Sequence, residues 1–433
     1  MFSLLILLSQ PTLLSLLPIL SLSFVNFISF TNLRFRSSFL YMFSLSDSFS
    51  LFIAYITFIV FFVSLYFIIN LKPSFGLYFS VYSIIVICCF IFSSSNIFLI
   101  YFFYEVSLFP ILFIIVRFGS YPDRSLRAFM LLSYTAFFSF PFLFVLFYFY
   151  CLDLRFNLPE LILTQSSFWQ GSSLLTFAIF LAFAVKLPMY GLHFWLPMAH
   201  VEAPTFGSII LAGVLLKLGG VGLIRLSFLM DLRLLRSFLL AYFMMATLLV
   251  TFICCFQSDF KRLVAYSSVS HIIAIPLLIA SRTFFSIKTI VLIMFFHGLR
   301  SPVLFMFVGV LYSVYSTRQL VAMRGLLLVS PLLRLFLVLG FLFTLSAPPF
   351  PSFLSEVFFF LSIYSLTPLR VFLMLVFAFI SLVYNLNWLT SILFVAPSKF
   401  QVNSFVSFSF RIFLPLILSF LLCVSLLILL PFF

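Results

Sequence analysis

Long apolar runs separated by short polar connections make up nearly the whole chain of 433 residues. Most runs match the ~20 residues that an α-helix needs to cross the hydrocarbon core of a bilayer. The runs are continuous, whereas the strands of a membrane barrel alternate between apolar and polar positions. The pattern therefore predicts an all-α polytopic membrane protein with about 13–14 transmembrane helices. The expected spans are residues 3–31, 50–71, 76–95, 97–117, 129–151, 173–195, 206–228, 235–257, 263–281, 285–312, 328–347, 350–367, 369–395 and 411–432.

Composition strengthens the membrane assignment. Hydrophobic residues make up 65% of the chain and charged residues 7%, against ~25% charged residues in a typical soluble domain. This excludes a soluble enzyme, a nucleic-acid-binding domain and a disordered chain. The net charge is +14, but the basic residues are scattered between apolar runs, which indicates lipid and no nucleic acid as the partner. The longest polar connection, residues 152–172, is too short for an extramembrane domain.

The sequence shows no set of residues that would bind a redox cofactor or a metal. The six cysteines form no C-x-x-C pair, so neither an iron–sulfur cluster nor a structural zinc site is indicated. The four histidines do not have the number or spacing needed to clamp haems between helices, and the sequence lacks a Gly-rich phosphate loop. We therefore expect no cofactor and no metal in this chain.

Apart from the basic residues near span ends, where long side chains reach the interface, a group of six ionisable residues stands out inside the expected spans. A charge at the bilayer centre costs roughly 2.5–3.5 kcal/mol on insertion scales, so such residues face a bundle interior and commonly mark ion or proton pathways. For any one of them, a structural ion pair or a polar helix contact is as good an explanation as a functional role. Acids, amines and imidazoles that alternate along one chain instead favour proton transfer, because each type can gain or lose a proton when buried. The six are Glu105, Lys186, Lys217, His271, His297 and Glu356.

Prolines predict helix breaks beside two of these residues. Lys186 is followed by Pro188, and Glu356 is preceded by the prolines of PPFP, residues 348–351. Broken helices at matching places in two halves of a transporter mark ion sites near the bilayer midplane. The separation of 356 − 186 = 170 residues corresponds to about five spans. It predicts two inverted five-helix repeats, with two ordinary proline kinks as the alternative.

Four motifs around these residues carry a family resemblance. Residues 185–226 read VKLPMYGLHFWLPMAHVEAPTFGSIILAGVLLKLGGVGLIRL, and residues 257–272 read QSDFKRLVAYSSVSHI. Residues 103–124 read FYEVSLFPILFIIVRFGSYPDR, and residues 295–305 read FFHGLRSPVLF. Together they resemble the antiporter-like membrane subunits of NADH:ubiquinone oxidoreductase (respiratory complex I), specifically the mitochondrial chain 4 family.

This resemblance implies a fold and a function. It implies about fourteen helices with two inverted five-helix repeats and broken helices, and the movement of a proton driven by quinone reduction elsewhere in the complex. Glu105 would pair with Lys186 on the first broken helix, and Lys217 would carry the path to the next helix. The implied units are N-terminal transmembrane helices in residues 1–96, a first antiporter-like repeat in 97–257, a second in 258–395, and a C-terminal transmembrane helix in 396–433.

By the same resemblance, His271 and His297 would continue the proton path to Glu356 on the second broken helix. Glutamate at that position favours chain 4, because the related chains 2 and 5 usually carry lysine there. Two residues depart from the family pattern. Arg300 stands where a small polar residue is usual, and Met198 stands where a lysine is common.

The resemblance also implies partners and a location. Flavin, iron–sulfur clusters and ubiquinone would lie in other subunits of the complex, with no cofactor in this chain. The partners would be other complex I subunits, especially neighbouring antiporter-like membrane subunits, together with membrane lipid. The location would be the mitochondrial inner membrane, with a bacterial cytoplasmic membrane as the less favoured alternative.

Two other functions stay open on the sequence alone. A subunit of a multi-subunit sodium/proton antiporter would share the fold and the early Glu105–Lys186 pair. A non-transporting membrane scaffold would use the same ionisable residues only to hold helices together.

Overall fold

The computed structural model describes residues 48–394, except for short stretches at 70–74, 120–121, 153–155, 159–160, 162–172, 231–234, 284, 325–330, 349, 351, 365 and 367. All regular secondary structure in this part of the chain is helical, apart from isolated bridges. Eight helices there are long and apolar enough to cross a membrane, so the predicted all-α polytopic fold is confirmed. The expected spans 3–31 and 411–432, the unit 396–433 and most of the connection 152–172 lie outside the described residues.

The helices follow the predicted spans closely. In the first half they are α3 (Ser48–Ile69), α4 (Phe75–Ser93), α5 (Ile97–Val106), α6 (Leu108–Phe118), α7 (Arg124–Cys151), α9 (Ser173–Ala184), α10 (Trp195–Glu202), α11 (Thr205–Ile210), the π-helical turn η2 (Leu211–Leu215) and α12 (Leu216–Leu226). In the second half they are α13 (Arg236–Cys255), α14 (Phe260–Ile272), α15 (Ala274–Ser281), α16 (Ser286–Tyr315), α17 (Pro331–Thr344), α18 (Ser352–Tyr364) and α19 (Pro368–Leu393).

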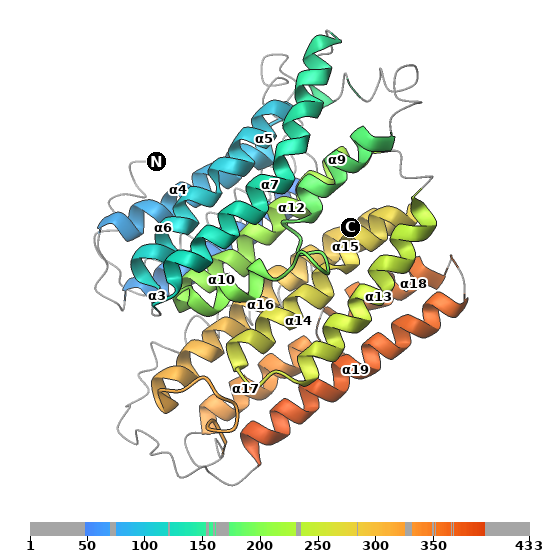
Figure 1. Ribbon diagram of the computed structural model, residues 1–433. Helices are drawn as coiled ribbons and strands as arrows, with labels where there is room; N and C mark the ends of the chain where they lie inside the picture. Colours follow the sequence, from blue (N-terminus) through green and yellow to red (C-terminus); the bar gives the residue numbers. More distant parts are fainter. Residues whose placement is uncertain are drawn as a thin grey trace.

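Two spans form the centre of the bundle (Figure 1). The span built from α11, η2 and α12 has an apolar window that is 100% buried, and the corresponding value for α16 is 94%, against 22% for α19. Small residues permit this central packing. A Cβ atom added at Gly222 of α12 would lie 2.2 Å from Cδ1 of Phe183 in α9. Phenylalanines such as Phe137 of α7 and Phe379 of α19 remain exposed on the outside, where the surroundings are lipid.

Two helix breaks lie where prolines predict them, one inside the expected span 173–195 and one between the expected spans 328–347 and 350–367. The expected span 173–195 is broken beside Lys186, as its proline predicts, because α9 stops at Ala184 and helix resumes only in α10. Pro188 lies in the break, where it can neither donate a main-chain hydrogen bond nor continue a helix. A second break separates α17 from α18 and contains Ser346 in the left-handed region, with φ of 51°. The relation of these breaks by two inverted repeats stays a prediction.

Arginine side chains close the ends of several helices. Arg225 is 4% exposed and donates to the last carbonyls of α4 and its cap, those of Ile91 (2.7 Å), Phe92 (2.5 Å) and Ser94 (3.1 Å). The last carbonyls of a helix have no partner within the helix and carry the negative end of its dipole. Arg225 therefore joins the end of α12 to the end of α4.

We expect Arg225→Met to lower the stability of the protein by about 2 kcal/mol or more, because it removes charged hydrogen bonds and leaves buried carbonyls without a donor. Thermal unfolding of the purified protein in detergent measures the change. Arg117→Met is the matched control, because Arg117 is exposed near the end of α6. Equal melting temperatures for the two variants would contradict this role of Arg225.

Candidate proton-transfer site

The first broken helix places a lysine against α5. Lys186 lies in the break after α9 and is 3% exposed. Its Nζ donates to the carbonyl oxygen of Tyr104 at 2.6 Å and lies 3.1 Å from the centroid of the Tyr104 ring, a cation–π position. The Tyr104 hydroxyl in turn donates to the carbonyl of Ala182 at 3.0 Å. The ammonium group is thus held between a helix break and an aromatic face.

The predicted glutamate lies next to this lysine without forming a contact ion pair. Glu105 is half-buried, and its Oε1 atom is buried without a hydrogen-bond partner among the described residues. The ion pair seen within 4.0 Å between two described residues joins Arg127 and Asp123 and does not involve Glu105. Glu105 acts on Lys186 electrostatically. The hydrogen bond of the Lys186 ammonium goes to the main chain.

The second lysine depends on the π-helical turn. Lys217, 1% exposed, donates to the carbonyl of Ala212 inside η2, and its Nζ lies 3.0 Å from Nδ1 of His297 on α16. A π-turn displaces the main-chain hydrogen bonds by one residue and is frequent at functional sites. Gly298 makes room for the lysine, because a Cβ atom there would lie 3.1 Å from Cε of Lys217. Lys217 and His297 therefore form a buried amine–imidazole pair.

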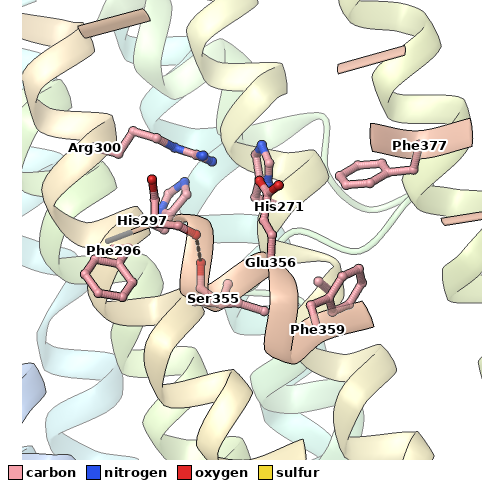
Figure 2. Close-up of a pocket in the computed structure, with 11 residues that line it drawn as sticks. His271, Phe296, His297, Arg300, Ser355, Glu356, Phe359 and Phe377 are labelled. Atoms are coloured by element: carbon pink, nitrogen blue, oxygen red, sulfur yellow. Dashed lines mark hydrogen bonds between the residues drawn. The ribbon is translucent and has the colours of Figure 1, made fainter. Parts of the chain in front are cut away.

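The remaining predicted residues surround one small cavity (Figure 2). His271, His297, Arg300 and Glu356 line it together with serines and phenylalanines of α16, α18 and α19. The space open to the centre of a water molecule is about 30 Å³, more than the ~10–15 Å³ that one water needs. The cavity therefore has room for water between ionisable groups from three helices.

The second broken helix provides the acid of the cavity. Ser346, in the break, donates from its hydroxyl to Oε1 of Glu356 at 2.6 Å. Arg300 is 7% exposed and donates to the carbonyl of Thr344, the last residue of α17, at 3.1 Å. Arg300 also acts electrostatically on Glu356. The arginine at position 300, which departs from the family pattern, thus places a permanent positive charge between the end of α17 and Glu356.

The six predicted residues form two groups. Glu105 and Lys186 lie together at the first break. The other four, Lys217, His271, His297 and Glu356, are linked through the Lys217–His297 contact and the cavity. Packing connects the two groups, because a Cβ atom at Gly219, two residues after Lys217, would lie 3.1 Å from Cγ of Leu187.

Sequence reasoning missed a buried cation at the start of α14. Lys261 is 5% exposed and donates to the carbonyls of Val201 (3.3 Å) and Ala203 (2.5 Å) at the end of α10. In the sequence it stands beside Arg262 in a polar stretch, and nothing there distinguishes the buried residue from its exposed neighbour. Only the packing of α14 on α10 makes the difference.

The departure at Met198 does not remove the local positive charge. Nη1 of Arg127 on α7 lies 2.8 Å from Sδ of Met198. Arg127 also acts electrostatically on Glu202, at the end of α10. The guanidinium of Arg127, which comes from another helix, thus supplies a positive charge next to α10 at the place where the family commonly has a lysine.

Fold and site together define a class: a polytopic helical membrane protein whose broken helices hold ionisable groups in its interior. Residues 94–383 match the family described as NADH:quinone oxidoreductase/Mrp antiporter, transmembrane. The chain belongs to this family. The resemblance to the chain 4 family is confirmed by its relatives.

Curated relatives carry the name NADH-ubiquinone oxidoreductase chain 4. The chain is 36% identical to the one from Ceratitis capitata over 312 residues, 71% of this chain and 69% of the relative. It is 34% identical to the one from Ascaris suum over 305 residues, 69% of this chain and 70% of the relative. With the one from Struthio camelus it shares 37% identity over 271 residues, 61% of this chain but only 59% of the relative.

Solved structures share the fold. A chain of respiratory complex I from Thermus thermophilus with bound NADH aligns with a TM-score of 0.76 at 21% identity, over 87% of this chain and 80% of that one. A chain of the membrane-bound sulfane sulfur reductase, an archaeal respiratory membrane complex, aligns with a TM-score of 0.78 at 18% identity, over 89% of this chain and 80% of that one.

The effects of substitutions at Arg300 and Glu356 on the stability of the protein should be coupled. Arg300→Leu leaves the acid without its nearby cation, and Glu356→Gln leaves the cation without the acid, so each single variant is destabilised. We expect the double variant to be more stable than the sum of the single changes predicts, by about 1 kcal/mol or more.

A double-mutant cycle of thermal unfolding in detergent measures this coupling. The matched control pairs Arg300→Leu with Glu105→Gln, because Glu105 belongs to the other group and its effect should add. Coupling energies of the same size in both cycles would show that the cavity does not link Arg300 to Glu356.

Proposed function

We propose that this chain is a proton-translocating membrane-arm subunit of NADH:ubiquinone oxidoreductase in the mitochondrial inner membrane. The observation that carries the proposal is the buried Lys217–His297 contact, which opens onto a cavity containing Glu356. The names of the curated relatives support it. The proton path would run from Glu105 and Lys186 through Lys217, His297 and His271 to Glu356.

Electrostatic repulsion makes the Lys217–His297 pair a transfer unit. At 3.0 Å, two positive charges repel by about 5 kcal/mol at an effective dielectric constant of about 20. The pair therefore holds one excess proton at a time, and the two groups titrate as a unit. A positive charge that arrives beside Lys217 favours release of that proton on the far side.

The geometry gives this transfer a direction. When Lys217 donates to Nδ1 of His297, the neutral imidazole carries its proton on Nε2. The Nε2 atom has no hydrogen-bond partner among the described residues, and His297 lines the cavity. A proton taken up at Nδ1 can therefore leave from Nε2 into the cavity shared with His271 and Glu356.

Electron transfer belongs to other subunits in this proposal. Flavin, iron–sulfur clusters and ubiquinone would be held elsewhere in the complex, and this chain would contribute proton movement coupled to NADH oxidation. Its partners would be other complex I subunits, especially neighbouring antiporter-like membrane subunits, and lipid around the exposed phenylalanines. The cation held by Tyr104 would respond to charge changes at Glu105.

Replacing either member of the first group should impair pumping. Lys186→Ala removes the buried cation and Glu105→Ala removes the carboxylate that acts on it, so we expect each variant to lose about tenfold or more in proton translocation. Proton uptake by membrane vesicles during NADH oxidation measures the effect, normalised to the amount of assembled complex. Wild-type proton-to-electron ratios in both variants would contradict the proposed path.

The double variant Lys186→Met with Glu105→Gln tests the scaffold alternative. It keeps side-chain size while removing both charges, so a purely structural role predicts normal assembly and normal pumping. We expect normal or nearly normal assembly with impaired pumping. This result separates a proton-carrying role from a helix-packing one.

Co-purification separates the proposed function from a sodium/proton antiporter. The matched family includes both kinds of protein. We expect the tagged chain, extracted in mild detergent, to bring with it flavin and iron–sulfur absorbance and NADH-oxidising activity. Recovery of a membrane complex without flavin or iron–sulfur centres would favour the antiporter.

A further inference from the structure

A buried histidine outside the predicted path lies on the last turns of α10. His200 is 0% exposed, and neither ring nitrogen has a hydrogen-bond partner among the described residues. Its ring stacks on Phe305 of α16, with centroids 4.6 Å apart and an interplanar angle of 11°. Leaving buried ring nitrogens without a partner costs free energy, so the role of this imidazole has to be sought in the groups around it.

His200 lies between two sets of charged groups, one around Lys261 and the other at the Lys217–His297 pair. On one side, Lys261 donates to the carbonyls of Val201 and Ala203, the residues that flank Glu202. On the other side, Phe305 lies 305 − 297 = 8 residues after His297 on α16, a rise of about 12 Å at 1.5 Å per residue. The imidazole is therefore about two helical turns from the Lys217–His297 pair, on the side of Lys261.

Lys261 marks one face of the membrane domain, which we call the Lys261 face. Helices α6, α10 and α13 end at this face and α7, α11 and α14 begin there, at the lower left of Figure 1. Charged side chains gather at it: Glu202 is influenced by Arg127, Arg318, Asp123 and Lys261. Arg318 also donates to the carbonyl of Val201 at 2.8 Å. The face thus offers both an acid and cations beside the helix that carries His200.

We propose that His200 is a proton-transfer residue that connects the Lys261 face to the buried Lys217–His297 pair. The inference rests on the proposed function and adds an entry point to it. His200 would accept a proton on one ring nitrogen from the side of Glu202 and Lys261. It would release a proton from the other nitrogen, through intervening water, toward Lys217, so that the imidazole returns to its neutral form without net change.

Electrostatic coupling supports the assignment. Lys261 and Lys217 both act on the His200 ring, and His200 acts on His297. A proton on His200 therefore repels protons on the groups at both sides of it. Entry of one proton at the face favours onward movement of the proton held by Lys217 and His297.

His193 provides a matched control on the same segment. It is 1% exposed, and its ring nitrogens also lack partners among the described residues. Its neighbours differ, because its ring stacks with Tyr190 and Phe194 and meets the edge of Tyr266. The two histidines thus share burial and lie seven residues apart, His193 in the turn before α10 and His200 inside α10, but of the two it is His200 that lies among lysines.

The test compares His200→Gln with His193→Gln in the assembled complex. We expect His200→Gln to lower proton translocation by about tenfold at normal assembly, and His193→Gln to leave it unchanged. Chemical rescue then distinguishes proton transfer from packing. In His200→Ala, added imidazole should restore translocation, whereas 1,2,4-triazole, which has a similar shape but is a much weaker base, should not.

The outcomes separate this inference from the proposed function. Loss of translocation in Lys186→Ala together with normal translocation in His200→Gln would overturn the role of His200 and leave the proposed function intact. Normal translocation in all of these variants would overturn both. Equal rescue by imidazole and triazole would show that His200 fills space and would overturn its proton-transfer role.

Discussion

Main-chain carbonyl oxygens hold the buried cations of this protein. The chain has 23 basic residues but only nine acidic ones, so carboxylates cannot neutralise each cation in the interior. Carbonyls at breaks, turns and helix ends accept the hydrogen bonds instead, because regular helix leaves them without a partner there. The pairs are Lys186 with Tyr104, Lys217 with Ala212, Lys261 with Val201 and Ala203, Arg300 with Thr344, and Arg225 with Ile91, Phe92 and Ser94.

This way of holding cations has a functional consequence. A carbonyl stabilises an ammonium group through its dipole but does not cancel its charge. The charge of Lys217 therefore remains available to act on His297, 3.0 Å away, and a change at one group is felt by the next. In a tight ion pair with a carboxylate, the ammonium group would hold its proton more firmly, and its charge would act less on neighbouring groups. Helix irregularity is thus the structural solution for buried charge and, in the proposed function, also the basis of proton movement.

Much of the fold could be predicted from apolar periodicity and proline positions. The expected span 76–95 is α4 (Phe75–Ser93), and the expected span 235–257 is α13. The ends of these helices can be predicted from the ends of the apolar runs, because the polar residues there lie at the membrane–water interface. The break in the span 173–195 follows from the proline and not from the apolar pattern. Hydropathy does not change there, and only the clash between Pro188 and helical geometry ends α9.

The sequence by itself determined the solvent, the helical class and the six ionisable residues, because a charged group in an apolar run is visible wherever the run folds. Tertiary structure decided which atoms these groups meet. It placed Lys186 on a carbonyl and not on Glu105, joined Lys217 to His297, and buried Lys261 while Arg262 stayed exposed. These contacts depend on the rotation and approach of helices that are distant in the chain. Spacing along one helix carries no information about the neighbour that each face will meet.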